Sequence, residues 1–196
     1  DHLRKVVGWA RERGTLVVSD ECYLGLGWDQ QPYSVLHPEV SGGDHTGLLA
    51  VHSLSKSSSL AGYRAGFVAG DAALVAELLA VRKHAGMMVP GPVQAAMVAA
   101  LDDDEHEIAQ RERYARRRQV LLAAFGSAGF SIEHSEAGLY LWATRGEPGR
   151  DTVDWLAQRG ILVAPGDFYG AAGARYVRIA MTAPDERVQT AAQRLG

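Results

Sequence analysis

Cysteine is nearly absent from this chain of 196 residues, and Cys22 is its only example. One cysteine cannot form an internal disulfide, and it cannot supply a set of thiolate ligands for a structural zinc ion. The composition therefore excludes a disulfide-stapled secreted scaffold, and we expect the protein to work in the cytoplasm.

Lysine is also scarce. Lys5, Lys56 and Lys83 are the only lysines, and all the other basic residues are arginines. Any chemistry that needs a lysine amine therefore has three candidates.

Long hydrophobic runs and concentrated positive charge are missing as well. No apolar stretch approaches the roughly 20 residues of a membrane-spanning helix, and residues 1–5 lack the apolar segment of a signal peptide. The net charge of -3 is scattered along the chain, which leaves no basic surface for nucleic acid. His52 and His84 have no partner at metal-ligand spacing. We expect no membrane, nucleic acid or metal among the partners.

The first residues read as the middle of a helix. Leu3, Val6, Val7 and Ala10 share one face at helical spacing, and Gly14 then ends the helix with no cap or linker before it. We expect that the N-terminal part of a longer protein precedes this segment.

Three short apolar runs rich in β-branched residues predict buried strands over residues 15–19, 48–53 and 65–70. Glycines, prolines and polar residues between 25 and 47 predict a loop. Asp71 is a candidate N-cap for a helix that continues to about residue 84, and a helix of small residues follows over 93–101. Leu74, Leu78 and Val81 are expected on the inner face of the first of these helices.

The composition changes after residue 101. A long charged helix is predicted from about 105 to 125, and the remainder alternates strand-like and helical segments, which is typical of a small α+β domain. The predicted strands cover 130–134, 139–144, 161–164 and 176–181, and the predicted helices cover 152–159 and the residues after Pro184. Residues 116–118, three arginines, are expected on a solvated helix face.

The segment from His52 to Gly66 carries the densest chemistry. It begins at the carboxyl end of a predicted strand, where open α/β sheets bind their ligands, and it holds Lys56, five serine hydroxyls and Arg64. A lysine held there is a usable nucleophile, and hydroxyl donors with a planar guanidinium suit a phosphate. A polar surface loop with a solvated lysine is the alternative.

Asp20 and Tyr23 favour a ligand-binding segment over a solvated loop. They also follow a buried strand and should lie at the same edge of the sheet as Lys56. A pyridine-ring aldehyde cofactor needs a carboxylate for its ring nitrogen, a donor for its phenolic oxygen, a lysine for a Schiff base and a phosphate cradle. These four roles fit Asp20, Tyr23, Lys56 and, for the phosphate, Ser53, Ser55 and Arg64.

The pattern D-E-x-Y, followed by S-x-S-K and G-Y-R-x-G-F, resembles the class I and II aminotransferases of the fold type I pyridoxal phosphate enzymes. The resemblance covers essentially the whole chain. It implies pyridoxal 5'-phosphate as cofactor, Lys56 as the catalytic lysine that bonds to it, Asp20 at the pyridine nitrogen and Tyr23 at O3'. By the same resemblance, Ser53, Ser55 and Arg64 hold the phosphate.

The second half of the chain carries the resemblance further. Residues 138–140 (GLY) and 165–170 (PGDFYG) match a strand and an active-site loop of the family's small domain. Arg178 falls where the family places the arginine that binds the substrate α-carboxylate. Taken alone, an arginine on a strand is more often a surface ion-pair partner.

Residues 19–28, 82–90 and 134–142 resemble the actinobacterial N-succinyldiaminopimelate aminotransferases. This likeness implies amino transfer from an amino acid, glutamate by expectation, to N-succinyl-2-amino-6-ketopimelate in diaminopimelate and lysine synthesis.

The resemblance also implies an α/β fold, the C-terminal part of a fold type I enzyme. Residues 1–104 would form the C-terminal part of the large cofactor-binding domain with its mostly parallel sheet, and residues 105–196 a bridging helix and the small α+β domain. A homodimer is expected, with small amino and keto acids as the other partners.

Three other functions stay open. The same cofactor residues serve other class I aminotransferases of aspartate, alanine or aromatic type, and they serve carbon-sulfur β-lyases, which eliminate rather than transfer. An aminotransferase-like effector domain of a transcription regulator is the third alternative.

Overall fold

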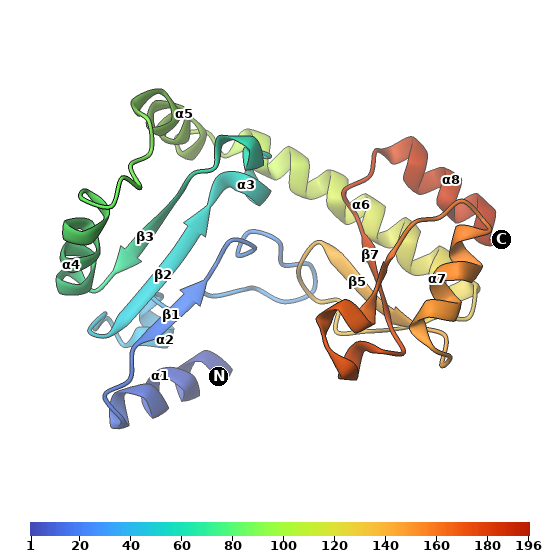
Figure 1. Cartoon of the computed structure of the whole chain (residues 1–196), viewed down its shortest axis with the longest axis horizontal. Helices are drawn as coiled ribbons and strands as arrows, with labels where there is room; N and C mark the ends of the chain where they lie inside the picture. Colours follow the sequence, from blue (N-terminus) through green and yellow to red (C-terminus); the bar gives the residue numbers. More distant parts are fainter. The chain divides into compact units, whose positions relative to one another are not determined.

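The computed structural model describes all residues from 1 to 196, and the chain divides into two compact units (Figure 1). The first unit holds residues 1–25 and 31–110, and the second holds residues 26–30 and 111–196. The division falls inside helix α6 (Glu105–Ser127), and a short stretch after Gly25 joins the second unit. None of the helices combines the length and the apolar character that a membrane span requires.

A three-stranded sheet forms the centre of the first unit. Its strands β1 (Val17–Asp20), β2 (Leu48–Ser53) and β3 (Gly66–Gly70) lie in that order. β1 runs parallel to β2, and β3 runs antiparallel to β2 with Ser53 opposite Gly66. The three predicted strands and the α/β class are confirmed.

Helices and turns surround this sheet, and their bounds are α1 (His2–Glu12), α2 (Pro38–Ser41), α3 (Leu54–Ser57), the 3-10 turn η1 (Ala61–Tyr63), α4 (Ala72–Arg82) and α5 (Gly91–Leu101). A small core joins α1 to the sheet through Val7, Val35, Leu48 and Ala50. The segment predicted as a loop therefore contains one helical turn and contributes Val35 to the core.

The N-terminal cap of α4 is the predicted one, but the buried face of the helix is not. Asp71 caps the helix by accepting hydrogen bonds from the backbone N–H groups of Ala73 and Leu74, as predicted. The predicted inner face is wrong, because Leu78 and Val81 are 42% and 64% exposed. An open groove of about 650 Å³ lies along α4, β3 and α5, so the apolar side chains of α4 line a groove instead of a closed core.

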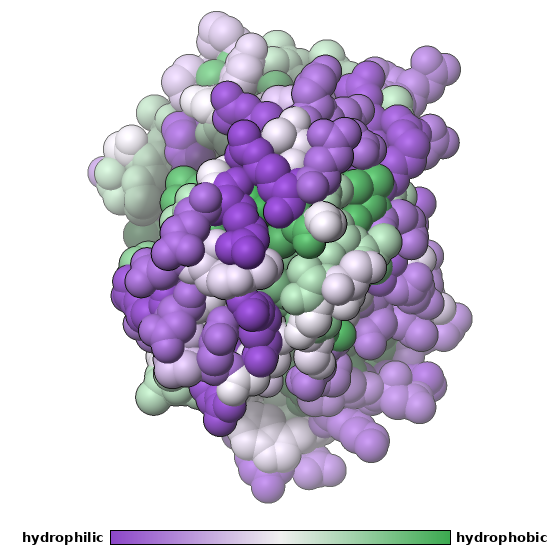
Figure 2. All heavy atoms as spheres, turned by 90° about the vertical axis from the view of Figure 1, so that its right-hand side faces the viewer, coloured by the Kyte–Doolittle hydropathy of each residue, from purple (hydrophilic) through white to green (hydrophobic).

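The second unit is an α+β structure with its own core. Its antiparallel sheet has the order β4-β5-β7-β6, and the long α6 packs its Leu121 and Phe125 into the core on the sheet. The elements are β4 (Ser131–Glu133), β5 (Tyr140–Thr144), α7 (Gly149–Ala157), β6 (Ala164–Pro165), η2 (Gly166–Tyr169), η3 (Ala171–Gly173), β7 (Val177–Ala180) and α8 (Asp185–Leu195). Figure 2 views this unit from the side of α7 and α8, where hydrophilic residues cover most of the surface.

Two predictions for this unit need correction. The strand expected at 161–164 is reduced to β6, a two-residue edge strand in which Pro165 has no N–H to donate. Of the arginines at 116–118, expected on a solvated face, only Arg116 is exposed. Arg118 is buried, and its charge is compensated by Asp29 at 2.5 Å and by a hydrogen bond to Ser135 Oγ at 3.1 Å. Arg117 pairs with Asp185.

Candidate active site

Six of the predicted site residues belong to the first unit. They lie at or after the carboxyl ends of two neighbouring strands. Asp20 ends β1, and Ser53 ends β2 just before α3, which holds Lys56. Because β1 and β2 are parallel, their carboxyl ends meet at one edge of the sheet. The topology of the first unit thus brings these polar groups to the same edge.

Asp20 is held as an anion at this edge. Its Oδ1 accepts a hydrogen bond from the backbone N–H of Cys22 at 3.1 Å. Hydrogen bonds from the Cys22 thiol and backbone lower the pKa of Asp20 below its ordinary value. A carboxylate with a lowered pKa is the group that a protonated pyridine nitrogen requires as a partner.

Lys56 and Tyr23 lie close enough to interact. The Lys56 Nζ atom is 5.9 Å from the centre of the Tyr23 ring, within the range of a cation–π contact. Lys56 is half-buried, and Tyr23 is 37% exposed. By contrast, Lys5 on α1 and Lys83 after α4 are both exposed.

The serine pair forms a compact hydroxyl cluster. Ser53 caps α3 by accepting from the backbone N–H of Ser55 at 3.1 Å, and its hydroxyl lies 2.7 Å from Ser55 Oγ. A contact to the Ala65 carbonyl at 3.2 Å ties the same hydroxyl to the start of β3. These donors have the chemistry that a phosphate requires.

The Arg64 guanidinium makes its hydrogen bond outside this hydroxyl cluster. The residue adopts a left-handed backbone conformation with φ 53°, which is uncommon for a residue with a side chain and is often found at functional sites. Its guanidinium donates to the Ala61 carbonyl at 2.9 Å rather than to either serine. The side chain is exposed and can turn toward an anion.

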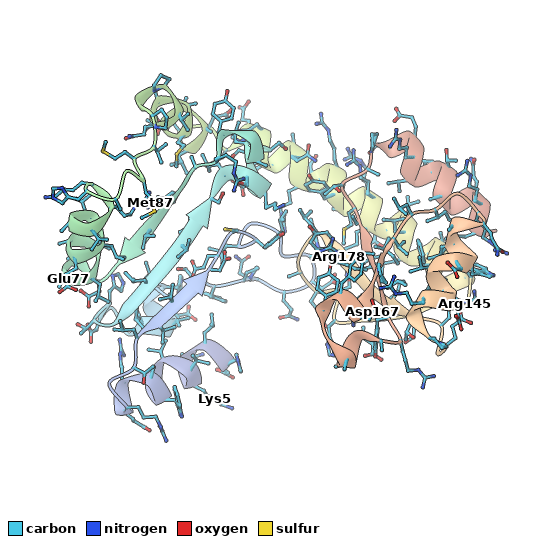
Figure 3. The ribbon with its side chains drawn as sticks, viewed as in Figure 1. Lys5, Glu77, Met87, Arg145, Asp167 and Arg178 are labelled. Carbon is cyan, nitrogen blue, oxygen red and sulfur yellow. The ribbon has the colours of Figure 1, made fainter.

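Arg178 belongs to the second unit, on β7, opposite Trp142 of β5 (Figure 3). Its guanidinium carbon lies 4.2 Å from the centre of the Tyr140 ring and 5.2 Å from that of Tyr169. The Nε atom is enclosed and has no hydrogen-bond acceptor. A buried donor without an acceptor is costly, so this arginine is suited to an anionic ligand rather than to a surface ion pair.

A buried glutamate was missed by the sequence reasoning. Glu21 is 6% exposed, and it lines a cavity of about 690 Å³ in the first unit together with Cys22, His52 and Ser53. The signal available in the sequence was its place between Asp20 and Tyr23, since strand alternation turns Glu21 toward the opposite face from Asp20.

No group of three or more histidine, cysteine, aspartate or glutamate side chains is arranged to hold a metal ion. The donor set is instead one anion beside a lysine, a tyrosine and paired hydroxyls. This set fits a phosphorylated pyridine aldehyde.

The family described as "Aminotransferase class I and II" matches residues 1–195. The chain is 78% identical to "Probable aminotransferase Rv1178" of Mycobacterium tuberculosis over all of its length and 47% of that protein. It is 64% identical to the "4-dedimethylamino-4-oxo-anhydrotetracycline transaminase OxyQ" of Streptomyces rimosus, with 98% of the chain and 54% of that protein covered.

More distant similarities agree with these. An "LL-diaminopimelate aminotransferase" of Oleidesulfovibrio alaskensis is 33% identical, with 98% of the chain and 50% of that protein covered. The substrate-bound structure of BacF from Bacillus subtilis has a TM-score of 0.86 and 27% identity, with 99% of the chain and 50% of that protein covered. The chain spans about half the length of the curated relatives that it matches.

Proposed function

The chain belongs to the class I and II aminotransferase family, whose members use pyridoxal 5'-phosphate, and from this premise we propose that it carries the catalytic lysine of a transaminase. The observation that supports the proposal is the joint placement of Asp20, Ser53 and Lys56 at the ends of two parallel strands. Tyr23 and Ser55 complete the set.

Each side chain has a defined role in this proposal, and Lys56 has two. When bound, the cofactor supplies a carbonyl that accepts an amino group and a ring that withdraws electrons. Lys56 Nζ attaches the cofactor, and its free amine removes and returns the proton at the substrate Cα. The anionic Asp20 keeps the ring nitrogen protonated, and the Tyr23 hydroxyl donates to the phenolic oxygen.

The anionic ends of cofactor and substrate are assigned to hydroxyl and guanidinium donors. We assign the phosphate to Ser53, Ser55 and Arg64, and the substrate α-carboxylate to Arg178. The enclosed Nε of Arg178 supports this assignment, because a carboxylate would supply the missing acceptor.

The acceptor we propose is N-succinyl-2-amino-6-ketopimelate, with glutamate as donor. The sequence likeness of residues 19–28, 82–90 and 134–142 supports it, and relatives named as LL-diaminopimelate aminotransferases are 32% or 33% identical to the chain. The product would then belong to diaminopimelate and lysine synthesis.

A second acceptor follows from a relative of higher identity. The name of the Streptomyces rimosus relative, 64% identical, describes a transaminase of a 4-oxo-anhydrotetracycline. Amino transfer to a ring ketone is therefore the second candidate. Initial rates of the full-length protein with glutamate and each ketone, beside pyruvate, oxaloacetate and aromatic keto acids, separate the two.

We also propose a homodimer in the cytoplasm. Met87 and Met88, between α4 and α5, are 55% and 71% exposed, and such apolar exposure is suited to a subunit contact. Light scattering of the full-length protein measures the dimer directly.

The central test of the function is covalent labelling. Borohydride reduction of the full-length protein with pyridoxal phosphate should mark the peptide that contains Lys56. Labelling of Lys5 or Lys83 alone would refute the assignment, and both peptides serve as internal controls because these lysines are exposed.

A further inference from the structure

The first unit contains a buried carboxylate that the proposed chemistry does not use. Glu21 Oε1 accepts a hydrogen bond of 2.7 Å from the backbone N–H of Val35. This bond fastens the segment after residue 30 to the end of β1. A glutamine would accept the same bond, so fastening the segment does not explain why a carboxyl group stands here.

The second carboxylate oxygen of Glu21 is buried without a hydrogen bond. Glu21 Oε2 lies 3.3 Å from His52 Nε2, is fully enclosed and makes no aligned hydrogen bond. Burying an ionised carboxylate is costly unless a nearby partner compensates it. His52 is the partner at hand, and its ring stacks on Phe67 of β3 at 5.1 Å between ring centres.

The backbone of Glu21 joins the same elements. Its N–H donates to the Val51 carbonyl at 2.9 Å, and its carbonyl accepts from the Leu24 N–H at 3.0 Å. Glu21 therefore ends the pairing of β1 with β2 and opens the turn that carries Tyr23. His52 directly precedes Ser53 in β2.

We propose that Glu21 is a positioning residue, which acts through His52 to hold the turn bearing Asp20 and Tyr23 in register with the strand end bearing Ser53. The inference rests on the proposed function, because the groups that Glu21 and His52 would position are those assigned to the cofactor. On this proposal the pair fixes the spacing between the carboxylate and the phosphate donors.

Two substitutions in the full-length protein isolate the pair. Glu21→Gln keeps the bond to Val35 and removes the charge, and His52→Phe keeps the ring stack on Phe67 and removes Nε2. Each should raise the Kd for pyridoxal phosphate about tenfold and shift the absorbance maximum of the bound cofactor. The double variant should be no worse than either single one, since the two residues act as one unit. Glu39→Gln, at an exposed glutamate of α2, should change neither quantity.

Three results would overturn the inference. The first is a Glu21→Gln protein whose unfolding temperature falls while cofactor affinity and absorbance stay unchanged, because its role would then be structural only. The second is a double variant whose loss of affinity is the product of the two single losses. The third is a wild-type protein that binds no pyridoxal phosphate, which refutes the proposed function as well; the first two leave that function intact.

Discussion

The Asp20 carboxylate accepts hydrogen bonds from both the backbone N–H and the thiol of Cys22, and each residue shifts the pKa of the other. The pKa of Asp20 is lowered by the two donors. The pKa of Cys22 is raised to about 11 by burial, by its hydrogen bond to Asp20 and by the negative charge of Asp20.

The first prediction concerns the titration of Asp20. Because its pKa in the folded protein is below the ordinary value, the ionised carboxylate favours the folded state at neutral pH, and this contribution is lost as the pH falls through the lowered pKa. Cys22→Ala removes the thiol donor but keeps the N–H, so the pKa of Asp20 should rise part of the way toward normal. Carboxyl NMR titration measures it, and Asp44, held by the Thr46 N–H, should stay unchanged as a control. An unaltered titration of Asp20 would show that the thiol contributes nothing.

The second prediction concerns thiol reactivity. With a pKa of about 11, Cys22 is protonated near neutral pH, and iodoacetamide should modify it about a hundredfold more slowly than a free thiol of pKa about 8.5 at pH 8. Asp20→Asn should speed the reaction, because it removes the charge that opposes the thiolate. A rate that levels off near pH 9 in the wild type would contradict the raised pKa.

The third prediction concerns the lysine. Lys56→Ala should lower transaminase turnover of the full-length protein by about a thousandfold or more, because both the attachment of the cofactor and the proton transfer are lost. Lys5→Ala and Lys83→Ala remove exposed lysines and should leave turnover near the wild-type rate. Comparable losses in all three variants would point away from Lys56.

The fourth prediction concerns Arg178. Arg178→Lys keeps the charge but loses the planar two-pronged geometry and the stacking on Tyr140 and Tyr169, so KM for the amino acid should rise about a hundredfold, more than kcat falls. The control is Arg175→Lys, at an exposed arginine beside β7. Steady-state kinetics separates the two constants, and a loss confined to kcat would argue against a role in carboxylate binding.

The fifth prediction compares two leucines of the second unit. Leu156 is fully buried in α7, and Leu162 is 92% exposed a few residues later. Leu156→Ala should lower the free energy of unfolding by about 3 kcal/mol, from lost transfer energy and the cavity left behind. Leu162→Ala should change it by less than about 0.5 kcal/mol. Denaturant unfolding measures both, and equal losses would place the core of this unit elsewhere.

The strands of the sheet and the polar segment after β2 could be predicted because their signals are local, although the helical turns α3 and η1 within that segment were not predicted. An apolar, β-branched run that ends in Asp20 or Ser53 predicts a buried strand with a polar group at its carboxyl end, and this prediction needs no knowledge of distant residues. The cap at Asp71 is equally local.

Features that depend on distant partners could not be predicted. Whether Leu78 meets a core or a groove depends on what lies against α4, and residues 72–82 are too uniformly apolar to mark one face. Arg118 reads as a surface charge until Asp29, far away in the chain, is placed beside it. Glu21 likewise has no visible partner until β2 brings His52 alongside β1.

The pairing of Ser53 with Gly66 has a consequence for the order of folding. Because β2 and β3 run antiparallel, the segment that holds Lys56 and Arg64 is closed by a contact between residues near in sequence, and short loops of this kind close within about a microsecond. Asp20 reaches the same edge only when β1 pairs with β2 across the long segment between them. We expect the lysine loop to take shape early and the carboxylate to join it late, which makes the β1–β2 pairing the slower step in assembling the site.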